Sequence, residues 1–352
     1  AVYPSACALG DQIVCVYRRG TAKHSRDGTL WAQSSNDGGA SWSAPAAVFN
    51  ALNSAAPESA HTGVVCSCDG AATVLLKTVE VRSPDAYIFS EEGRRLRQRA
   101  WLCRGKGGGL AWSEPVELKL RGGPRDVYLG CRPLVLPTGR LFVPVEATAE
   151  HGQQMMLGCF SDDNGRTLSP LDTVAHDPAG RLGFGDGKVE LLDDDRIVML
   201  MWTYLNPGEE TIEAHRCVSS DGGRTWSPPE PTGAVCQVIT PLRLGDGSLL
   251  AAGNVRTPPE GIRLLHSTDA GASWTGTPVQ LWDARQWRVT GEPMPISAAG
   301  DDSVIWDALP GFTFGCPEMV LLDGGDVLMV YYAVVNEVTH VRACRFAVDV
   351  SA

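Results

Sequence analysis

The chain has 352 residues, of which 43% are hydrophobic and 20% are charged, and its formal net charge is −11. These values are ordinary for a globular protein, and no apolar run is long enough to span a membrane. The acidic balance argues against a general nucleic-acid binder, which needs cations to neutralise phosphates. It disfavours an anionic substrate only weakly, because the charge inside a pocket can oppose the net charge.

Eleven cysteines are present, an odd number, and most stand singly within apolar segments. Cys66 and Cys68 are the closest pair, and they flank nothing that resembles a zinc knuckle. We therefore expect buried free thiols, and neither a metal nor another cofactor. This use of cysteine favours a reducing compartment. The chain begins at Ala1 rather than Met, which is consistent with processing or trimming.

Tight turns rich in Asp and Gly join two apolar segments at six places along the chain. Two β-rich runs around such a turn indicate a hairpin. A third apolar strand follows most hairpins, and we expect a fourth strand to complete each unit. The hairpins are residues 8–15, 66–76, 135–143, 190–198, 242–250 and 320–328, and the third strands are residues 29–33, 154–158, 213–217, 261–265 and 340–344.

A second repeat, Ser-x-Asp-x-Gly-x-Ser/Thr-Trp, follows several of the third strands. Its copies begin at Ser35, Ser161, Ser219 and Ser267, and a relic at residues 107–112 keeps the Gly and the Trp. In a hairpin turn, the Asp accepts backbone N–H bonds, the Gly permits a backbone that other residues resist, and the Trp fills the space beneath. We therefore interpret the four aspartates of this repeat motif as structural.

Repeats at this period are typical of arrays, solenoids or propellers. Six hairpins indicate an all-β fold, a six-bladed β-propeller with four antiparallel strands per blade, and no segment shows helical periodicity. The repeats fill the chain, so we predict one domain over residues 1–352. Its approximate blades are residues 1–48, 58–116, 126–172, 183–230, 236–282 and 310–350.

Strand alternation sorts the loops of such a propeller into two faces. The turns between first and second strands share one face with the repeat motif. The opposite face collects the beginnings of the inner strands and the loops after the second strands, which are rich in Arg, His, Glu and Trp. We predict the functional site at that opposite channel mouth, with a glycan or a small acidic sugar as partner. Arg binds carboxylates bidentately, aromatic rings stack on sugars, and two carboxyls can cleave a glycoside.

The repeat motif, the run Tyr17-Arg18-Arg19-Gly20 leading to Asp27, and the closing Gly315-Cys316-Pro317 with Tyr331-Tyr332 resemble the sialidase (neuraminidase) superfamily, the six-bladed propellers with Asp-box or BNR repeats. The resemblance covers nearly the whole chain. It implies a hydrolase that removes a terminal sialic acid or a related acidic sugar, and a habit of secretion, which leaves the localisation open. In that family, three arginines bind the substrate carboxylate, an Asp of the first blade is the acid/base, and a Tyr activated by a Glu is the nucleophile.

Two positions depart from the family pattern. Val2 stands where the first Arg of the family would lie, and Cys316 stands near the position of the nucleophilic Tyr. Tyr331 and Tyr332 lie on the following strand and do not fit that role. The sequence therefore favours carboxylate chemistry, such as an inverting hydrolysis in which water is the nucleophile.

The candidate residues follow from their places on this face. Those proposed for catalysis are Asp27, Glu58, Asp186 and His24; those proposed for substrate binding are Arg18, Arg19, His61, Arg132, Glu146, Trp202, Gln237, Arg256 and Glu318. Glu146 and Glu318 are further candidates for the acid or base, and His61 could assist. Two alternatives stay open: a non-catalytic glycan-binding propeller, and a polysaccharide lyase in which a Tyr or His abstracts a proton.

Overall fold

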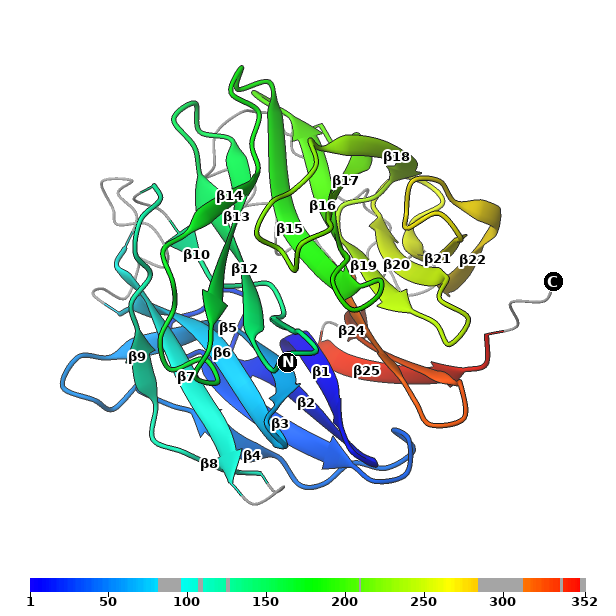
Figure 1. Ribbon diagram of the computed structural model, residues 1–352. Helices are drawn as coiled ribbons and strands as arrows, with labels where there is room; N and C mark the ends of the chain where they lie inside the picture. The colour runs from blue at the N-terminus through cyan, green and yellow to red at the C-terminus, as the bar shows by residue number, and fades with distance from the viewer. Residues whose placement is uncertain are drawn as a thin grey trace.

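The computed structural model describes residues 1–81, 96–106, 110–124, 127–208, 210–283 and 313–335 and 338–348, with only the backbone described over 276–283. Six small antiparallel sheets form the blades of a β-propeller, as predicted (Figure 1). The described part contains no helix long and apolar enough to cross a membrane. Part of the relic motif, residues 107–109, lies outside the described residues.

The strands follow the chain blade by blade, from the inner strand to the outer one. Blade 1 comprises β1 (Val2–Leu9), β2 (Gln12–Arg19), β3 (Thr29–Ser35) and β4 (Ala46–Phe49). Blade 2 comprises β5 (Glu58–Cys68), β6 (Ala71–Glu80), β7 (Gln98–Lys106), β8 (Ala111–Trp112) and β9 (Val116–Leu118). Blade 3 comprises β10 (Val127–Tyr128), β11 (Leu134–Val135), β12 (Leu141–Thr148), β13 (Gln154–Ser161) and β14 (Asp172–Ala175).

Blades 4 to 6 comprise β15 (Leu182–Leu191), β16 (Ile197–Leu205), β17 (Glu213–Ser219) and β18 (Glu230–Val235); β19 (Ile239–Arg243), β20 (Leu249–Val255), β21 (Gly261–Ser267) and β22 (Thr275–Asp283); and β23 (Phe314–Leu321), β24 (Val327–Val335) and β25 (Val338–Phe346). The sixth sheet has three strands within the described residues, whereas each of the others has at least four.

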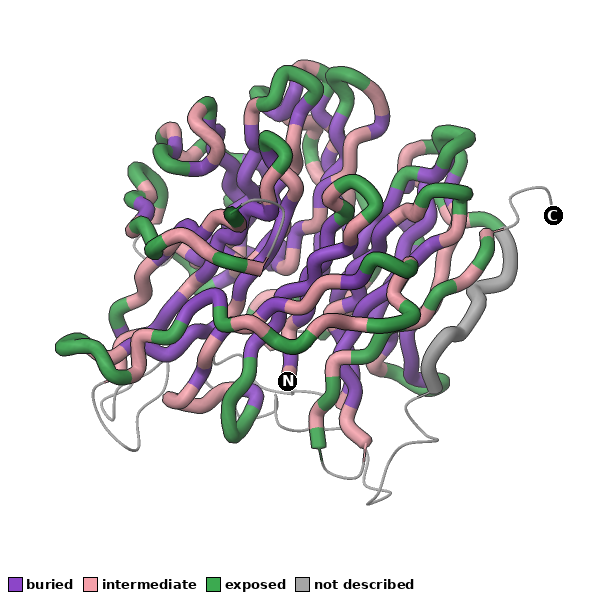
Figure 2. The backbone as a smooth tube through the Cα atoms, turned by 90° about the horizontal axis from the view of Figure 1, so that it is seen from below, coloured by how far each residue is buried: buried purple, intermediate pink, exposed green. Residues whose placement is uncertain are grey.

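Six hydrophobic clusters hold the blades together, one at each interface between neighbours. The second strands are buried along nearly their whole length, as in β16, because both of their faces pack against other blades. This explains why their sequences are continuous apolar runs rather than alternating ones. Figure 2 shows the buried strands between exposed turns. Nine of the eleven cysteines are buried free thiols, as expected from the sequence.

The repeat motifs form the turns that follow the third strands. In the first copy, Gly39 N–H donates to Ser35 Oγ at 2.9 Å, and Ser41 donates its N–H and hydroxyl to Asp37 at 2.8 and 2.5 Å. The same bonds recur around Asp163, Asp221 and Asp269. Hydrogen bonds from Ser41 and Ser35 lower the pKa of Asp37 to about 2. These carboxylates are occupied as acceptors within their own turns.

Four inner strands carry a β-bulge near their beginning, at the mouth of the channel opposite the repeat motifs. The register shifts lie between Val2 and Ser5, Ala60 and Thr62, Gly185 and Lys188, and Gly315 and Glu318. Tyr3, Asp186 and Cys316 sit inside three of these bulges with φ of 54°, 50° and 49°. Bulges re-aim side chains and occur often beside active sites. The bulges therefore lie at the channel mouth where we predicted the functional site from the sequence.

Candidate active site

Aromatic side chains from three blades meet at the mouth of the channel. The hydroxyl of Tyr3 lies 2.6 Å from His24 Nε2, and the ring of His24 lies 5.0 Å from that of His61. The centre of the Tyr3 ring also lies 6.3 Å from the centre of the His61 ring, which it stacks on. It lies 6.0 Å from the centre of the Tyr332 ring, which it meets edge-on. We call Tyr3, His24, His61 and Tyr332 the aromatic wall. It unites the two histidines predicted from sequence with two tyrosines that were not.

Glu146 and Asp186 form a carboxyl pair in the same mouth. The backbone N–H of Asp186 donates to Glu146 Oε1 at 2.6 Å, which joins blade 4 to blade 3. Burial and the nearby charge of Asp186 raise the pKa of Glu146 to about 7. Burial also raises the pKa of Asp186, although Lys188, Lys77 and Arg256 oppose the effect. Two carboxyls close together cannot both ionise easily, so this pair retains a proton near neutral pH.

Lys23, Lys77 and Arg256 surround the carboxyl pair and the aromatic wall with positive charge. The charge of Lys77 acts on the pKa of His24, in the aromatic wall, and on the pKa values of Glu146 and Asp186. Its ammonium therefore lies near both the aromatic wall and the carboxyl pair. Lys23 Nζ lies 4.8 Å from the centre of the Tyr332 ring. Burial, aided by the charge of Arg256, lowers the pKa of Lys23 to about 7.

Arg256 is fixed by its neighbours in blades 5 and 6. Its Nε donates to Gln237 Oε1 at 2.9 Å, and its Nη1 donates to the carbonyl of Phe314 at 2.7 Å. A Cβ added to Gly315 would approach Arg256 Nη2 to 2.9 Å and the Tyr332 hydroxyl to 3.0 Å. The guanidinium therefore lies directly over the bulge of β23, and the predicted residues Arg256 and Gln237 act as one unit.

Arg132 and Glu318 belong to an ion network deeper in the channel. Lys188 Nζ lies 2.8 Å from Glu318 Oε1, and Arg132 approaches Glu318 at 3.7 Å and Glu190 at 3.9 Å. Lys188 and Glu318 each follow a bulge residue by two positions along an inner strand. The network joins the inner strands of blades 3, 4 and 6, and its charges compensate one another.

Arg18 and Glu58 satisfy groups inside the protein instead of facing the mouth. Arg18 is completely buried, and its guanidinium donates to the carbonyls of Ala60, Ala22 and Ser25 at 2.6 to 2.8 Å. Glu58 is buried too: it pairs with Arg99 and accepts hydrogen bonds from Thr78 and Trp101. Both side chains reinforce the loops that carry the aromatic wall.

Arg19 and Trp202 also lie against their own blades. The guanidinium of Arg19 is exposed and stacks on Trp31, 4.9 Å from the ring centre. The indole N–H of Trp202 donates to Thr211 at 3.0 Å, and its ring lies 4.6 Å from that of Tyr204. The structure does not bring these two side chains together with the residues of the mouth.

Asp27 holds the loop that supplies Lys23 and His24. Its carboxylate accepts hydrogen bonds from the N–H of Thr21 at 2.9 and 3.1 Å, and from the Thr21 hydroxyl at 3.1 Å. These bonds and one from Ser25 outweigh the effect of burial and keep the pKa of Asp27 below its usual value. An acid/base residue of a glycosidase needs a raised pKa, so Asp27 fits a positioning role better.

Sequence reasoning missed Tyr3, Lys23 and Tyr332 as site residues. Tyr3 stands beside Val2, the first departure from the sialidase pattern, and Lys23 directly precedes the predicted residue His24. Their positions in the sequence could therefore have indicated both residues. Tyr332 was assigned to the correct strand, but its hydroxyl reaches across to the neighbouring bulge. Among the described residues, no group of three or more His, Cys, Asp or Glu side chains could hold a metal ion.

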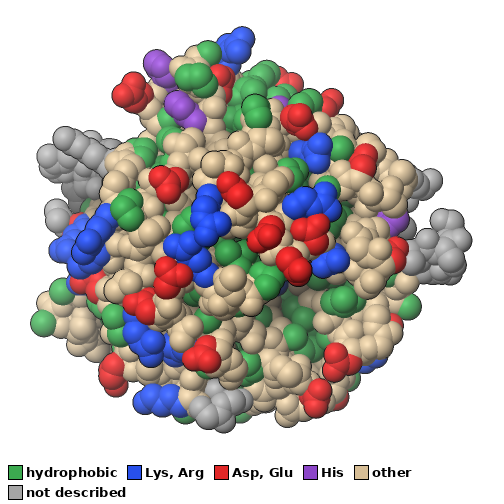
Figure 3. All heavy atoms as spheres, in the orientation of Figure 1, with side chains coloured by type: hydrophobic (Ala, Val, Ile, Leu, Met, Phe, Trp, Pro, Cys, Tyr) green, Lys and Arg blue, Asp and Glu red, His purple; other side chains and the backbone are tan. Residues whose placement is uncertain are grey.

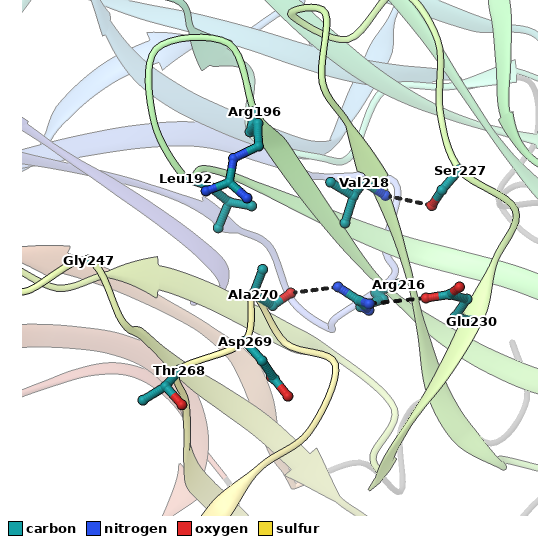
Figure 4. A pocket seen from close by; sticks show the side chains of 10 residues that line it. All are labelled: Leu192, Arg196, Arg216, Val218, Ser227, Glu230, Gly247, Thr268, Asp269 and Ala270. Atoms are coloured by element: carbon teal, nitrogen blue, oxygen red, sulfur yellow. Dashed lines mark hydrogen bonds and ion pairs between the residues drawn. The ribbon is translucent and has the colours of Figure 1, made fainter.

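A second cavity of about 450 Å³ opens between blades 4 and 5, beside the fourth repeat motif (Figure 4). Its charged groups are paired: Arg216 with Glu230 at 3.0 Å, and Arg196 with Asp193 at 2.6 Å. Asp269, also in its lining, accepts the hydrogen bonds of its own motif. The cavity lacks the aromatic rings and the carboxyl pair of the channel mouth.

No family model and no curated protein matches the chain, but solved structures match its fold over 98% of its length. They include a protein of unknown function from Dyadobacter fermentans, with 20% identity, a TM-score of 0.73 and 94% of that chain covered. The Hadza microbial sialidase Hz136 matches with 16% identity and a TM-score of 0.66, over 65% of its chain. The intramolecular trans-sialidase from Ruminococcus gnavus matches with 12% identity and a TM-score of 0.65, over 94% of its chain. Identities this low establish the fold alone, a sialidase-like six-bladed propeller.

Proposed function

We propose that this sialidase-like propeller is a glycoside hydrolase, which removes a terminal sialic acid or a related acidic sugar at the bulge-lined mouth of its channel. The observation that carries the proposal is the carboxyl pair of Glu146 and Asp186, which shares one mouth with the cations Lys77 and Arg256 and with an aromatic wall. Glycoside cleavage needs a protonated acid beside a second carboxylate.

The cations account for binding of an acidic sugar to a protein of net negative charge. Lys77 and Arg256 lie near Asp186, and Lys77 also lies near Glu146, so positive charge reaches the carboxyl pair despite the negative net charge of the chain. The guanidinium of Arg256 suits a carboxylate, because it presents several N–H donors in one plane. Figure 3 shows acidic and basic side chains interspersed over the face that it presents.

Hydrolysis uses the two carboxyls in different protonation states. Glu146, with a pKa of about 7, donates its proton to the leaving glycosidic oxygen as the bond to the sugar breaks. Asp186, ionised in the same complex, takes a proton from the water that attacks the anomeric carbon. The Asp186 N–H and Lys77 then stabilise the carboxylate that forms on Glu146. This hydrolysis uses water as the nucleophile and requires no tyrosine at Cys316.

A panel of aryl glycosides that includes aryl sialosides tests the proposal. We expect turnover by the wild type, and a loss of about 100-fold or more in kcat for Asp186→Asn. Asp194→Asn is the matched control, because Asp194 is an exposed residue of the turn after β15. Full activity of Asp186→Asn would remove the assigned base.

A non-catalytic glycan-binding propeller is the second candidate, favoured by the two departures at Val2 and Cys316. Glycan binding to the wild type without turnover of any member of the panel would establish it and overturn the hydrolase.

A further inference from the structure

We propose that the same mouth cleaves glycans of uronic acids by β-elimination, with Tyr3 and His24 as the pair that abstracts the proton. The inference rests on the acidic-sugar site proposed above, but it uses the opposite wall and yields a different product. The observation behind it is that the Tyr3 hydroxyl lies 2.6 Å from His24 Nε2. The hydrolysis proposed for Glu146 and Asp186 assigns no catalytic step to this pair.

The backbone holds Tyr3 at an energetic cost. Its φ of 54° lies in the left-handed region, where a residue with a large side chain is an outlier. Pro4 follows directly, and proline favours an extended backbone at the residue before it. Such strain costs on the order of 1–3 kcal/mol and persists only where surrounding structure enforces it, which is typical of functional sites. The bulge of β1 is what turns the phenol toward His24.

The imidazole of His24 is neutral, and its proton affinity must rise when substrate binds before it can take the proton of Tyr3. Burial, together with the charges of Arg18, Lys77 and Lys23, lowers the pKa of His24 to about 3, so the ring is neutral. A neutral ring accepts a hydrogen bond from the Tyr3 hydroxyl through Nε2. An anionic sugar in the mouth would offset the charges of Lys23 and Lys77 and make protonation of His24 easier. The pair would thus become active when a uronate binds.

The elimination balances with groups already in the mouth. Lys23, Lys77 and Arg256 neutralise the carboxylate of the uronate, which acidifies the C–H bond beside it. Tyr3 passes its proton to His24, and its oxygen takes the proton from that carbon. The electron pair left behind forms a C=C bond and expels the glycosidic oxygen one carbon further on, which receives the proton of Glu146. Solvent then takes a proton from His24 and returns one to Glu146. No water is added and no oxidant or reductant is consumed.

The products distinguish this reaction from hydrolysis. Elimination gives an unsaturated uronate that absorbs in the ultraviolet, whereas hydrolysis gives two saturated sugars whose combined mass includes one added water. The substrates to use are oligogalacturonides and hyaluronan oligosaccharides, incubated with the full chain and followed by ultraviolet absorbance and mass spectrometry. We expect an absorbing product without added water from at least one of them.

Tyr3→Phe keeps the ring and removes the hydroxyl, so the aromatic wall stays filled. We expect it to reduce formation of the unsaturated product by about 100-fold or more, a larger loss than it causes in hydrolysis of an aryl sialoside. Asp186→Asn should show the reverse pattern. Tyr17→Phe is the matched control, because the Tyr17 hydroxyl donates to Gln33 of β3 at 2.7 Å, a bond within blade 1 that involves no residue of the aromatic wall. Thermal unfolding checks that each variant is folded.

The outcomes separate the two proposals. Saturated products alone, with hydrolysis of the sialoside intact, would overturn the elimination and leave the hydrolase standing. Unsaturated product that Tyr3→Phe forms at the wild-type rate would overturn the assignment of the pair. The absence of any product from uronates and sialosides alike would overturn both.

Discussion

Asp186 illustrates how single residues shape the mouth. Its φ of 50° is left-handed, and glycines precede and follow it. A Cβ on Gly185 would meet Gln154 Oε1 at 2.3 Å, and one on Gly187 would meet Met156 Cε at 2.6 Å. A larger residue at either position would have to displace the ends of the Gln154 and Met156 side chains of blade 3. The packing turns the Asp186 N–H toward Glu146 and its side chain toward the channel.

The raised pKa of Glu146 gives the hydrolysis a pH dependence of definite sign. The acid acts only when protonated, so kcat/KM should fall as the pH rises through about 7, by up to tenfold per unit above it. Glu146→Gln should lower the maximum and abolish this basic limb. Initial rates with an aryl sialoside between about pH 5 and 9 measure both effects. A limb that persists unchanged in Glu146→Gln would assign it to another group.

At the scale of elements, the repeat motif joins neighbouring blades as well as capping its own turn. Arg104 of β7 donates to the carbonyl of Asn164 in the motif of the next blade at 3.5 Å. Arg216 of β17 makes the equivalent bond to Ala270 at 3.4 Å. These arginines connect the third strand of one blade to the turn of the following one, and this supports the structural interpretation of the motif.

Removal of a motif carboxylate should therefore reduce stability and leave the activity unchanged. Asp221 accepts bonds from Arg224, Ser219 and Thr225, with distances between 2.6 and 3.0 Å. We expect Asp221→Ala to lower the free energy of unfolding by about 1–2 kcal/mol. Urea unfolding monitored by tryptophan fluorescence measures this, with Asp194→Ala as the control. A large loss of activity in a folded Asp221→Ala protein would contradict the assignment of the two faces.

The strands were predictable because local patterns determine them. The third strands appear where expected, for example at Thr29–Ser35 and Glu213–Ser219, since apolar alternation and the following motif bracket them. The bulges were not predictable, because each depends on packing against the next blade. The roles of Arg18 and Arg19 were equally hidden: neighbours along a strand face opposite sides, and sequence does not say which side meets a loop carbonyl.

The grouping of several candidate residues at one mouth was predictable from the sequence. His24, His61, Glu146, Asp186, Gln237 and Arg256 lie there, because the strand order alone places the beginnings of the inner strands on one face. Whether a charged side chain is free to bind a ligand depends on its neighbours in the folded structure, which the sequence does not show. Glu58 was indistinguishable from Glu146 in sequence, yet Arg99 neutralises the first and no cation pairs as closely with the second within the described residues.

At the scale of the whole molecule, ring closure brings the two ends of the chain to the same site. The inner strand β1 packs against β23 and β24, so Tyr3 of the first blade meets Tyr332 of the last (Figure 1). The aromatic wall therefore exists only when the propeller is closed. Each interface between blades holds its own hydrophobic cluster, which fixes the positions of the six inner strands around the channel.

The central claim is that the mouth lined by the bulges, and not the face with the repeat motifs, receives the acidic sugar. Calorimetric titration of sialic acid and of galacturonic acid into the wild type, Arg256→Gln and Arg196→Gln tests it most directly. Arg256 lies over the bulge of β23, and Arg196 lines the cavity between blades 4 and 5. We predict that Arg256→Gln weakens binding at least tenfold, which corresponds to about 1.4 kcal/mol, and that Arg196→Gln binds like the wild type. Binding that is lost in Arg196→Gln and retained in Arg256→Gln would contradict the account.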